Sequence, residues 1–211
     1  LAVLVSRPLD TFRSETWEIV DGRPVKLALP ERVTIRGALG GGSAAAPPRL
    51  VFTVEEAWAP NNIKKVGAGA LMAVGMRLLR PPPPNVGLVM TNADTSVFEP
   101  TARESLEEVA VFDDRLVASV YDNVRGRVSV FSDKDEAAGW VETALPAPAN
   151  SAIHLGSASR ETGRIFYTHE GFLTPSTLNL ANANSITAEV VRRAPERFDA
   201  SGHVVEQFEA T

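Results

Sequence analysis

The residues of this chain whose types could do chemistry are serines, histidines and paired carboxylates, and their spacing decides what they could do together. A nucleophilic serine of the Gly-x-Ser-x-Gly type sits on a strained turn between a strand and a helix. The nearest stretch is Leu155–Ser159 (LGSAS), which ends in serine where the motif needs glycine and has no helical pattern after it. We therefore interpret this stretch as a turn between strands and not as a nucleophile.

The histidines do not form a recognisable ligand or catalytic group. His154, His169 and His203 lie far apart in the sequence, whereas metal ligands usually include a short local spacing such as i, i+4 on a helix. None of them has the serine and aspartate partners of a catalytic triad in its neighbourhood. The histidines are therefore predicted to be structural or solvent-facing and to form no metal site, and the interpretation of the chain given below implies no organic cofactor.

Two further patterns, paired glutamates and a glycine-rich stretch, are weak evidence for a catalytic or nucleotide-binding site. The pairs Glu55-Glu56 and Glu107-Glu108 offer adjacent carboxylates for acid–base work, but neighbouring residues of a strand point to opposite faces. We expect these charges on exposed strand edges, where they discourage edge-to-edge pairing. Gly67–Ala73 (GAGALMA) departs from the dinucleotide-binding spacing and lacks a strand–helix–strand context, so it predicts no nucleotide site.

Composition limits the class of protein. The 211 residues suffice for a buried core, and a net charge of −5 without a basic cluster argues against nucleic acid as a partner. The absence of cysteine excludes disulfides and thiolate metal sites, and it is compatible with the cytoplasm and with the periplasm. No apolar run is long enough to span a bilayer, and Leu1–Val5 is too short for a signal peptide. We expect the chain to begin inside a longer polypeptide.

The elements that would position any site are short β-type runs rich in Val, Thr and aromatic residues, separated by turn residues. The sequence predicts strands at Leu1–Ser6, Thr11–Val20, Val25–Leu29, Val33–Leu39, Leu50–Val54, Ala70–Val74, Val86–Met90, Val109–Phe112, Arg115–Tyr121, Arg127–Phe131, Trp140–Leu145, Arg164–Thr168, Thr177–Leu180, Thr187–Arg192 and Val204–Glu209. An all-β fold follows from this pattern, either a β-propeller or a β-sandwich. We expect Trp17, Trp58 and Trp140 to fill sheet cores.

Two low-complexity stretches and a loose repeat complete the pattern. Gly40–Pro48 predicts a flexible connector, and Pro81–Pro84 predicts a polyproline II loop, with an SH3-type ligand as the less favoured alternative. Neither is interpreted as a domain boundary, so residues 1–211 are treated as one domain. A period of roughly 45 residues is the size of a four-stranded propeller blade and gives about four blades.

Three blocks near the C-terminus occur in a recognisable order: Gly171–Leu178 (GFLTPSTL), Arg193–Ala200 (RAPERFDA) and Val204–Thr211 (VVEQFEAT). Physically, the first is typical of the corner between two strands, where Gly171 permits a bend, Phe172 and Leu173 anchor the core, and Pro175 begins a strand. In this order the blocks resemble the end of the β-propeller domain of prolyl oligopeptidase-family serine peptidases.

The resemblance extends over nearly the whole chain. Further similar blocks are Leu4–Arg7 (LVSR), Phe12–Trp17 (FRSETW), Ala68–Val74 (AGALMAV), Phe98–Leu106 (FEPTARESL), Asp122–Arg127 (DNVRGR) and Gly139-Trp140. The stretches 40–48 and 81–84 depart from the shorter or more polar connections of the family. This departure concerns local blade geometry and not membership of the family.

The resemblance implies a fold and a function. The chain would be the later part of a seven-bladed β-propeller, and the Ser, Asp and His of an α/β-hydrolase domain would follow Thr211. The parent would be a serine endopeptidase that hydrolyses short peptides after proline, with this portion non-catalytic and gating substrate access. Its partners would be the remaining blades, the hydrolase domain and short proline-containing peptides, with self-association of the isolated chain as a further expectation.

One polar cluster is a candidate for substrate contact under this resemblance. The propeller's tunnel and loops touch the substrate peptide in the family, so Arg125 and Arg127 could meet a carbonyl or carboxylate group. A β-turn held by Asp122 and Asn123 is the alternative interpretation. A different function, a stand-alone propeller-like domain that binds a protein or peptide on its loops, also remains open.

Overall fold

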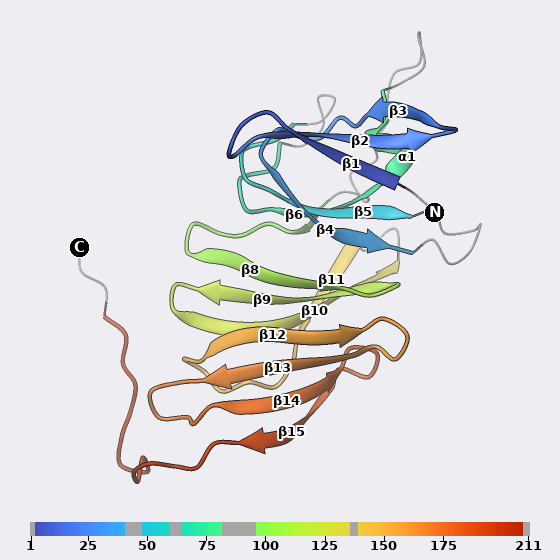
Figure 1. Ribbon diagram of the computed structural model, residues 1–211. Helices are drawn as coiled ribbons and strands as arrows, with labels where there is room; N and C mark the ends of the chain where they lie inside the picture. Colours follow the sequence, from blue (N-terminus) through green and yellow to red (C-terminus); the bar gives the residue numbers. More distant parts are fainter. Residues whose placement is uncertain (1–2, 41–47, 60–64, 82–95, 136–138, 209–211) are drawn as a thin grey trace. The chain divides into compact units, whose positions relative to one another are not determined.

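The computed structural model describes residues 3–40, 48–59, 65–81, 96–135 and 139–208 (Figure 1). In these ranges the chain forms four sheets, each built from strands that follow one another along the sequence, and one short helix. Such meanders arise because alternating apolar and polar residues give a strand one face to bury, and short turns connect antiparallel neighbours. The all-β prediction is confirmed.

The first two sheets come from the N-terminal half. The first has three strands in the order β1-β2-β3, namely β1 (Val3–Pro8), β2 (Ser14–Val20) and β3 (Arg23–Lys26). The second has four strands in the order β4-β5-β6-β7, namely β4 (Val33–Leu39), β5 (Arg49–Val54), β6 (Leu71–Gly75) and β7 (Ser96–Phe98). The helix α1 (Met76–Leu79) directly follows β6.

The last two sheets have four strands each. The third runs β11-β10-β9-β8 and contains β8 (Glu104–Val111), β9 (Arg115–Asp122), β10 (Arg125–Asp135) and β11 (Gly139–Ala144). The fourth runs β12-β13-β14-β15 and contains β12 (Ala152–Ser159), β13 (Arg164–Glu170), β14 (Thr177–Asn182) and β15 (Thr187–Arg193). A consecutive four-stranded meander is the construction of a propeller blade. The β-sandwich alternative is wrong, because a sandwich has two sheets, whereas this chain forms four separate sheets of consecutive strands.

The chain divides into two compact units. The first unit comprises residues 1–101, 111–115 and 132–141, and the second comprises residues 102–110, 116–131 and 142–211. The first unit is built on an apolar cluster in which β5 and β6 are buried, with Phe52 and Met72 at its centre. Its buried Glu18 carboxylate accepts two hydrogen bonds from Arg80, at 2.7 and 2.8 Å, so this charge is paired where water is scarce.

The second unit has a core with a polar component. Ile153, Ile165 and Tyr167 are almost completely buried, and the Tyr167 hydroxyl donates a hydrogen bond to the Pro146 carbonyl. Beside them the buried Asn179 amide donates to Nδ1 of His169 at 2.9 Å. Buried polar groups are stable when paired in this way, and the pair links β13 with β14.

The tryptophans differ from expectation in two cases. Trp58 packs against the first unit's cluster, with its ring 5.6 Å from that of Phe52, as predicted. Trp17 is half-buried on one face of the first sheet, and Trp140 is half-buried beneath the guanidinium of Arg49, 5.1 Å from the ring centre. The Trp140 contact is a cation–π interaction, which alternation along the strand does not reveal.

The strands predicted from the sequence differ from those of the structure at a few places. The sequence missed β12 as a strand, and the LGSAS stretch predicted as a turn lies inside it, next to a bulge between Leu155 and Ala158. The strand predicted at Val204–Glu209 is wrong, because residues 204–208 form no strand. The strand predicted at Val86–Met90 lies outside the described residues, as does most of the Gly40–Pro48 connector.

Candidate functional site

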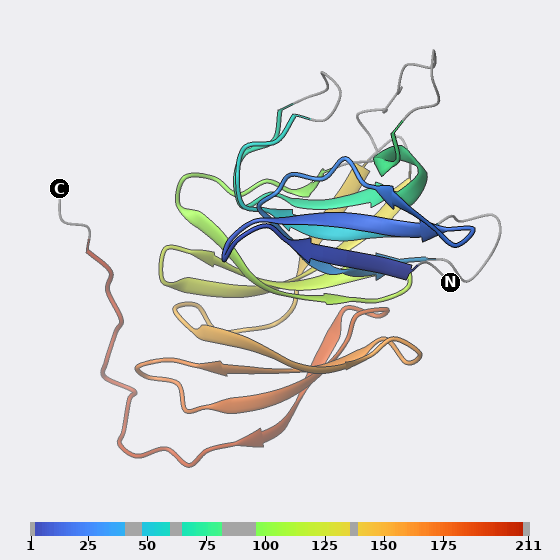
Figure 2. The ribbon, with the colours of Figure 1, turned by 45° about the horizontal axis from the view of Figure 1, so that its top comes forward.

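Several connections of the second unit meet at one end of its strands. Antiparallel neighbours run in opposite directions, so every second connection of a meander lies at the same end. These are the β9–β10 turn, the β11–β12 connection, the β13–β14 loop and the stretch that follows β15 (left side of Figure 1; Figure 2). Any site formed by these connections therefore lies at the ends of the strands of two sheets, which hold the connections in place.

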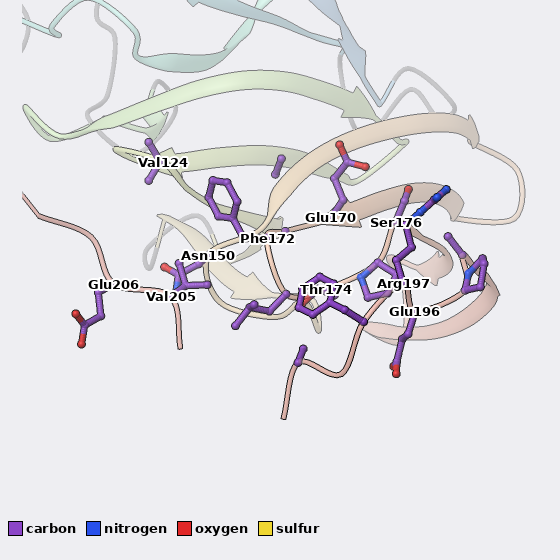
Figure 3. A pocket seen from close by; sticks show the side chains of 18 of the residues that line it. Val124, Asn150, Glu170, Phe172, Thr174, Ser176, Glu196, Arg197, Val205 and Glu206 are labelled. Carbon is purple, nitrogen blue, oxygen red and sulfur yellow. The ribbon is translucent and has the colours of Figure 1, made fainter. Parts of the chain in front are cut away.

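A hollow of about 640 Å³ lies among these connections. Its lining is mostly apolar and includes Val124, Phe172, Leu173, Phe198 and Val205 (Figure 3). The surface chemistry that it offers is mainly apolar contact, with a few polar and charged side chains among the lining residues. A concave apolar surface with a few polar groups is the usual form of a binding site.

The β13–β14 loop presents the largest of these side chains. Gly171 N–H donates to the Thr174 carbonyl at 2.9 Å, and Thr174 N–H donates back to the Gly171 carbonyl at 3.3 Å. This closed turn leaves Phe172 84% exposed and Leu173 half-buried. The corner between two strands is confirmed at Gly171–Leu178, but the interpretation of Phe172 as a core anchor is wrong, because the turn directs its ring away from the core.

The β11–β12 connection forms another side of the hollow through close backbone approaches. The Gly126 N–H donates to the Ser151 carbonyl at 2.9 Å, which joins the start of β10 to this connection. A Cβ atom on Gly171 would lie 3.0 Å from the Asn150 carbonyl oxygen, so the loop and the connection are nearly in contact. Asn150 itself has a φ of 58°, a left-handed conformation that asparagine tolerates better than most residues.

The stretch after β15 forms the remaining wall. Ala194 N–H donates to the Ser176 carbonyl at 2.9 Å, which holds the start of this stretch against the β13–β14 loop. Further along, the Asp199 carboxylate accepts a hydrogen bond from Ser201 N–H at 3.0 Å, and this bond lowers the pKa of Asp199. The turn places the ring of Phe198 5.7 Å from that of His203, edge to face.

Acidic side chains outnumber basic ones among the residues that line the hollow. Glu170, Glu196 and Glu206 are exposed lining residues, and Arg197 is the one basic residue among those that line the hollow in the described part of the chain. Glu196 also lies 3.7 Å from the guanidinium of Arg193. Because Glu196 is paired in this way, Glu170 and Glu206 supply the remaining acidic charge of the lining, beside the basic Arg197.

The two arginines predicted to contact substrate lie on β10. Arg127 donates at 2.9 Å to Glu142 and at 2.9 Å to Glu104, so its guanidinium bridges carboxylates of the third sheet. Burial by itself lowers the pKa of Arg127, but these two carboxylates outweigh it and raise the pKa above its usual value. Arg125 is exposed beside the β9–β10 turn, where Asn123 has a φ of 54°. Substrate contact by either arginine stays a prediction.

The other candidate residues are dispersed. His154 is exposed on β12, His169 is buried on β13 and His203 lies after β15. Among the described residues, no group of three or more His, Cys, Asp or Glu side chains could hold a metal ion. Within the same ranges, no helix has the length and apolar character needed to cross a bilayer.

Sequence reasoning missed two carboxylates with structural roles. Glu108, expected on an exposed edge, is half-buried and accepts a hydrogen bond from Leu155 N–H at 2.6 Å. Glu55 accepts a hydrogen bond from the Thr34 hydroxyl on the neighbouring strand β4. The sequence signal that could have found Glu108 is the period of two along Glu104–Val111, which puts Glu108 on the same face as Leu106 and Ala110.

Comparison with known proteins identifies the fold family. Residues 84–194, more than half of the chain, match the family model described as "Prolyl oligopeptidase, N-terminal beta-propeller domain". The chain belongs to this family. Its sheets are therefore blades of part of a β-propeller, as the sequence resemblance predicted.

Relatives of this propeller portion are larger peptidases. The Uncharacterized peptidase y4nA of Sinorhizobium fredii is 29% identical over 97% of this chain, which covers 27% of that protein. The Uncharacterized peptidase RP174 of Rickettsia prowazekii is 30% identical over 54% of the chain and 16% of the relative. The chain thus spans about a quarter or less of these relatives.

Solved structures show the same fold. A post-proline cleaving enzyme from Rickettsia typhi superposes with a TM-score of 0.75 at 21% identity, over 98% of this chain and 28% of the enzyme. A second match comes from a structural and mechanistic study of two prolyl endopeptidases, with a TM-score of 0.56 at 13% identity, over 94% of this chain and 27% of that one. At these identities the likeness concerns the architecture of the blades.

Proposed function

We propose that this chain is the non-catalytic, substrate-gating propeller portion of a serine peptidase that hydrolyses short peptides after proline. The observation that carries the proposal is the family match over residues 84–194, together with a superposition on a post-proline cleaving enzyme that covers 98% of this chain. The catalytic Ser, Asp and His would belong to the remainder of the parent polypeptide.

The physical role of such a propeller is to exclude folded proteins and bulk water from the catalytic groups. Rigid four-stranded blades form a barrier with a narrow access route, which a short, extended peptide can pass but a folded protein cannot. The same barrier keeps bulk water from the reacting groups. The hollow of the second unit offers apolar surface for this role, and the residues that line it include no Gly-x-Ser-x-Gly turn.

The first test is the reading frame beyond Thr211 and the activity of its product. We expect a Gly-x-Ser-x-Gly motif followed by an aspartate and a histidine. The complete polypeptide should cleave a short proline-containing peptide and leave the same sequence uncleaved inside a folded protein. The 211-residue chain alone should cleave neither.

Each result has a distinct meaning. A stop codon directly after Thr211 would reduce the chain to a propeller-like binding domain without peptidase activity. Equal cleavage of the free peptide and of the folded protein would refute gating while leaving the peptidase assignment in place. Cleavage by the 211-residue chain would show that its non-catalytic assignment is wrong.

A further inference from the structure

The two edges of the fourth sheet differ in how their backbone groups are used. At β12, the N–H groups of Ile153 and Leu155 bind side-chain oxygens from β9 and β8. At β15, the other edge (Figure 1), the backbone makes no hydrogen bond within the described residues except with β14. Free N–H and C=O groups along an edge are available for pairing with another strand. The edge of β15 is therefore the place where this sheet can accept a further strand.

The side chains of β15 include two exposed valines between two exposed charges. Val190 is 61% exposed and Val191 is 51% exposed. Glu189 precedes these valines and Arg192 follows them, and both charged side chains are exposed. In the part of the chain that the structure describes, neither charge has an ion-pair partner. The strand thus has an apolar centre between two unmatched charges of opposite sign.

A bulge places these two charges on the same face of the sheet. Arg192 lies opposite Leu178 of β14, and residues that lie opposite each other in a sheet share a face. Glu189 lies opposite Leu180, which shares a face with Leu178 because the two are two positions apart. Residues three apart in a regular strand face opposite ways, and the extra residue of the bulge, Val191, removes this difference. Glu189 and Arg192 therefore project from one face, on either side of the valines.

This pattern of charges is complementary to itself. When two copies of the strand pair antiparallel across a two-fold axis at the valines, Glu189 of each copy lies opposite Arg192 of the other. The valines of the two copies meet at the axis, where their apolar surface is removed from water. Charges and a bulge discourage pairing with an unrelated strand, because such a strand leaves the charges unmatched. A second copy of this chain matches both charges at once.

We infer that β15 is the contact through which two copies of this chain form a two-fold symmetric dimer, with an antiparallel sheet that continues from one copy into the other. The inference is independent of the proposed function, because it uses the pairing and the side chains of the fourth sheet alone. The strand has seven residues, so the contact is smaller than a standard protein interface. We therefore expect a weak dimer whose population rises with protein concentration.

The test is charge reversal at the two positions, with association measured by sedimentation velocity of the 211-residue chain. Glu189→Arg and Arg192→Glu each put like charges into both symmetric pairs, so each should weaken dimerisation by about tenfold or more. An equimolar mixture of the two variants restores opposite charges in both pairs, so it should associate as strongly as the unsubstituted chain. Arg164→Glu reverses an exposed charge on β13 and should leave association unchanged.

The mixture separates this contact from any other mode of association. A contact elsewhere on the chain is indifferent to which of the two variants meets the other, so the mixture would associate no more strongly than its components. That result would overturn the inference, as would equal association of the unsubstituted chain and both single variants. Association that Trp17→Lys abolishes and both reversals leave intact would assign the contact to the first sheet and would overturn the inference too.

Amide hydrogen exchange distinguishes pairing of strands from a contact between side chains alone. In the unsubstituted chain, exchange within residues 187–193 should slow as protein concentration rises, because the free amides of the edge become hydrogen-bonded across the axis. Exchange that stays constant while the chain dimerises would overturn the inference. Slowing that requires an added proline-containing peptide and does not depend on protein concentration would assign the edge to an extended peptide, which would also overturn it.

Discussion

At the scale of single residues, Gly126 near the start of β10 occupies a position with no room for a side chain. A Cβ atom on Gly126 would lie 2.6 Å from the Ser151 carbonyl oxygen and 2.8 Å from Cγ1 of Ile153. The first neighbour is backbone and the second is a buried side chain, so neither can move aside without breaking the bridge between Gly126 and Ser151. Small side chains matter here because the interior is close-packed.

Gly126→Ala should therefore destabilise the chain by about 1–3 kcal/mol, the usual cost of an overpacked site. The measurement is the urea midpoint of the loss of β-sheet circular dichroism. Gly67→Ala is the matched control, because a Cβ atom there meets nothing within 4 Å. A midpoint for Gly126→Ala that equals that of the control would contradict the close approach.

His169 makes stability depend on pH. Burial, and then the positive charge of Arg193, hold the pKa of His169 below its ordinary value of 6.5. Its Nδ1 accepts a hydrogen bond from Asn179, which requires that this nitrogen carry no proton. Since the folded state favours the neutral ring, this contribution to stability is complete above the unfolded pKa and is lost as the pH falls below it.

We expect His169→Gln to flatten the decline of the unfolding free energy between about pH 7 and pH 5. A single proton limits the difference in slope to about 1.4 kcal/mol per pH unit. His154→Gln, at an exposed position on the adjoining strand, controls for removal of an imidazole. Identical slopes for the unsubstituted chain and His169→Gln would argue that His169 titrates alike in both states.

At the scale of elements, the free edge of β12 is covered by side chains. Ile153 and Leu155 lie opposite His169 and Tyr167 of β13, and their N–H groups bind side-chain oxygens instead of backbone carbonyls. The Tyr121 hydroxyl accepts from Ile153 N–H at 2.7 Å and donates to its carbonyl at 3.0 Å. An uncovered edge would be available for pairing with another chain.

Tyr121→Phe should leave the Ile153 N–H without its acceptor, at a cost of about 1–3 kcal/mol. The measurement is amide exchange of Ile153 and Leu155, which should accelerate more than that of β14. Glu108→Gln retains a carbonyl acceptor for Leu155 and should perturb the strand less than Glu108→Ala. Unchanged exchange at Ile153 in Tyr121→Phe would show that the hydroxyl does not protect this edge.

A comparison of β5 and β9 with β12 shows which strands can be predicted from the sequence and which cannot. Strands such as β5 and β9 were predicted from apolar and β-branched runs, because their own side chains are buried. Leu155–Ser159 was interpreted as a turn, since its small residues carry no such signal. In the structure it belongs to β12, whose backbone is satisfied by β13, Tyr121 and Glu108. The residues that pair with β12 are distant in the sequence, so local sequence patterns do not predict this strand.

The candidate site was less predictable than the sheets. Val204–Phe208 has β-type residues but forms no strand, because propensity needs a neighbouring strand to pair with. Phe172 looked like a core residue, and only the closed turn of Gly171 and Thr174 reveals its outward direction. The resemblance of Gly171–Leu178 to the family located the loop, whereas the hollow required three-dimensional contacts.

At the scale of the whole molecule, the first sheet presents an apolar face that resembles an unfinished repeat. Val5, Trp17, Ile19 and Pro24 line a second hollow of about 480 Å³ on this sheet. Terminal repeats of stacked proteins normally carry a polar outer face, because an apolar one promotes association. If the proposed function holds, a neighbouring blade of the longer polypeptide covers this face.

The 211-residue chain should therefore self-associate as its concentration rises, and Trp17→Lys should weaken the association by placing a charge on the apolar face. Sedimentation velocity over a range of concentrations measures this. Phe12→Lys is the control, since Phe12 is 76% exposed but does not line this hollow. If Trp17→Lys and Phe12→Lys associate equally strongly, the contact between copies does not lie on this apolar face.

The division into two units also separates the fluorophores. Trp17, Trp58 and Trp140 all belong to the first unit, while Tyr121 and Tyr167 belong to the second. Tryptophan emission, excited at wavelengths that tyrosine does not absorb, therefore reports on one unit without labels. The β-sheet circular dichroism has contributions from both units, so comparing its melting transition with that of the tryptophan emission can reveal whether the two units melt together or in sequence.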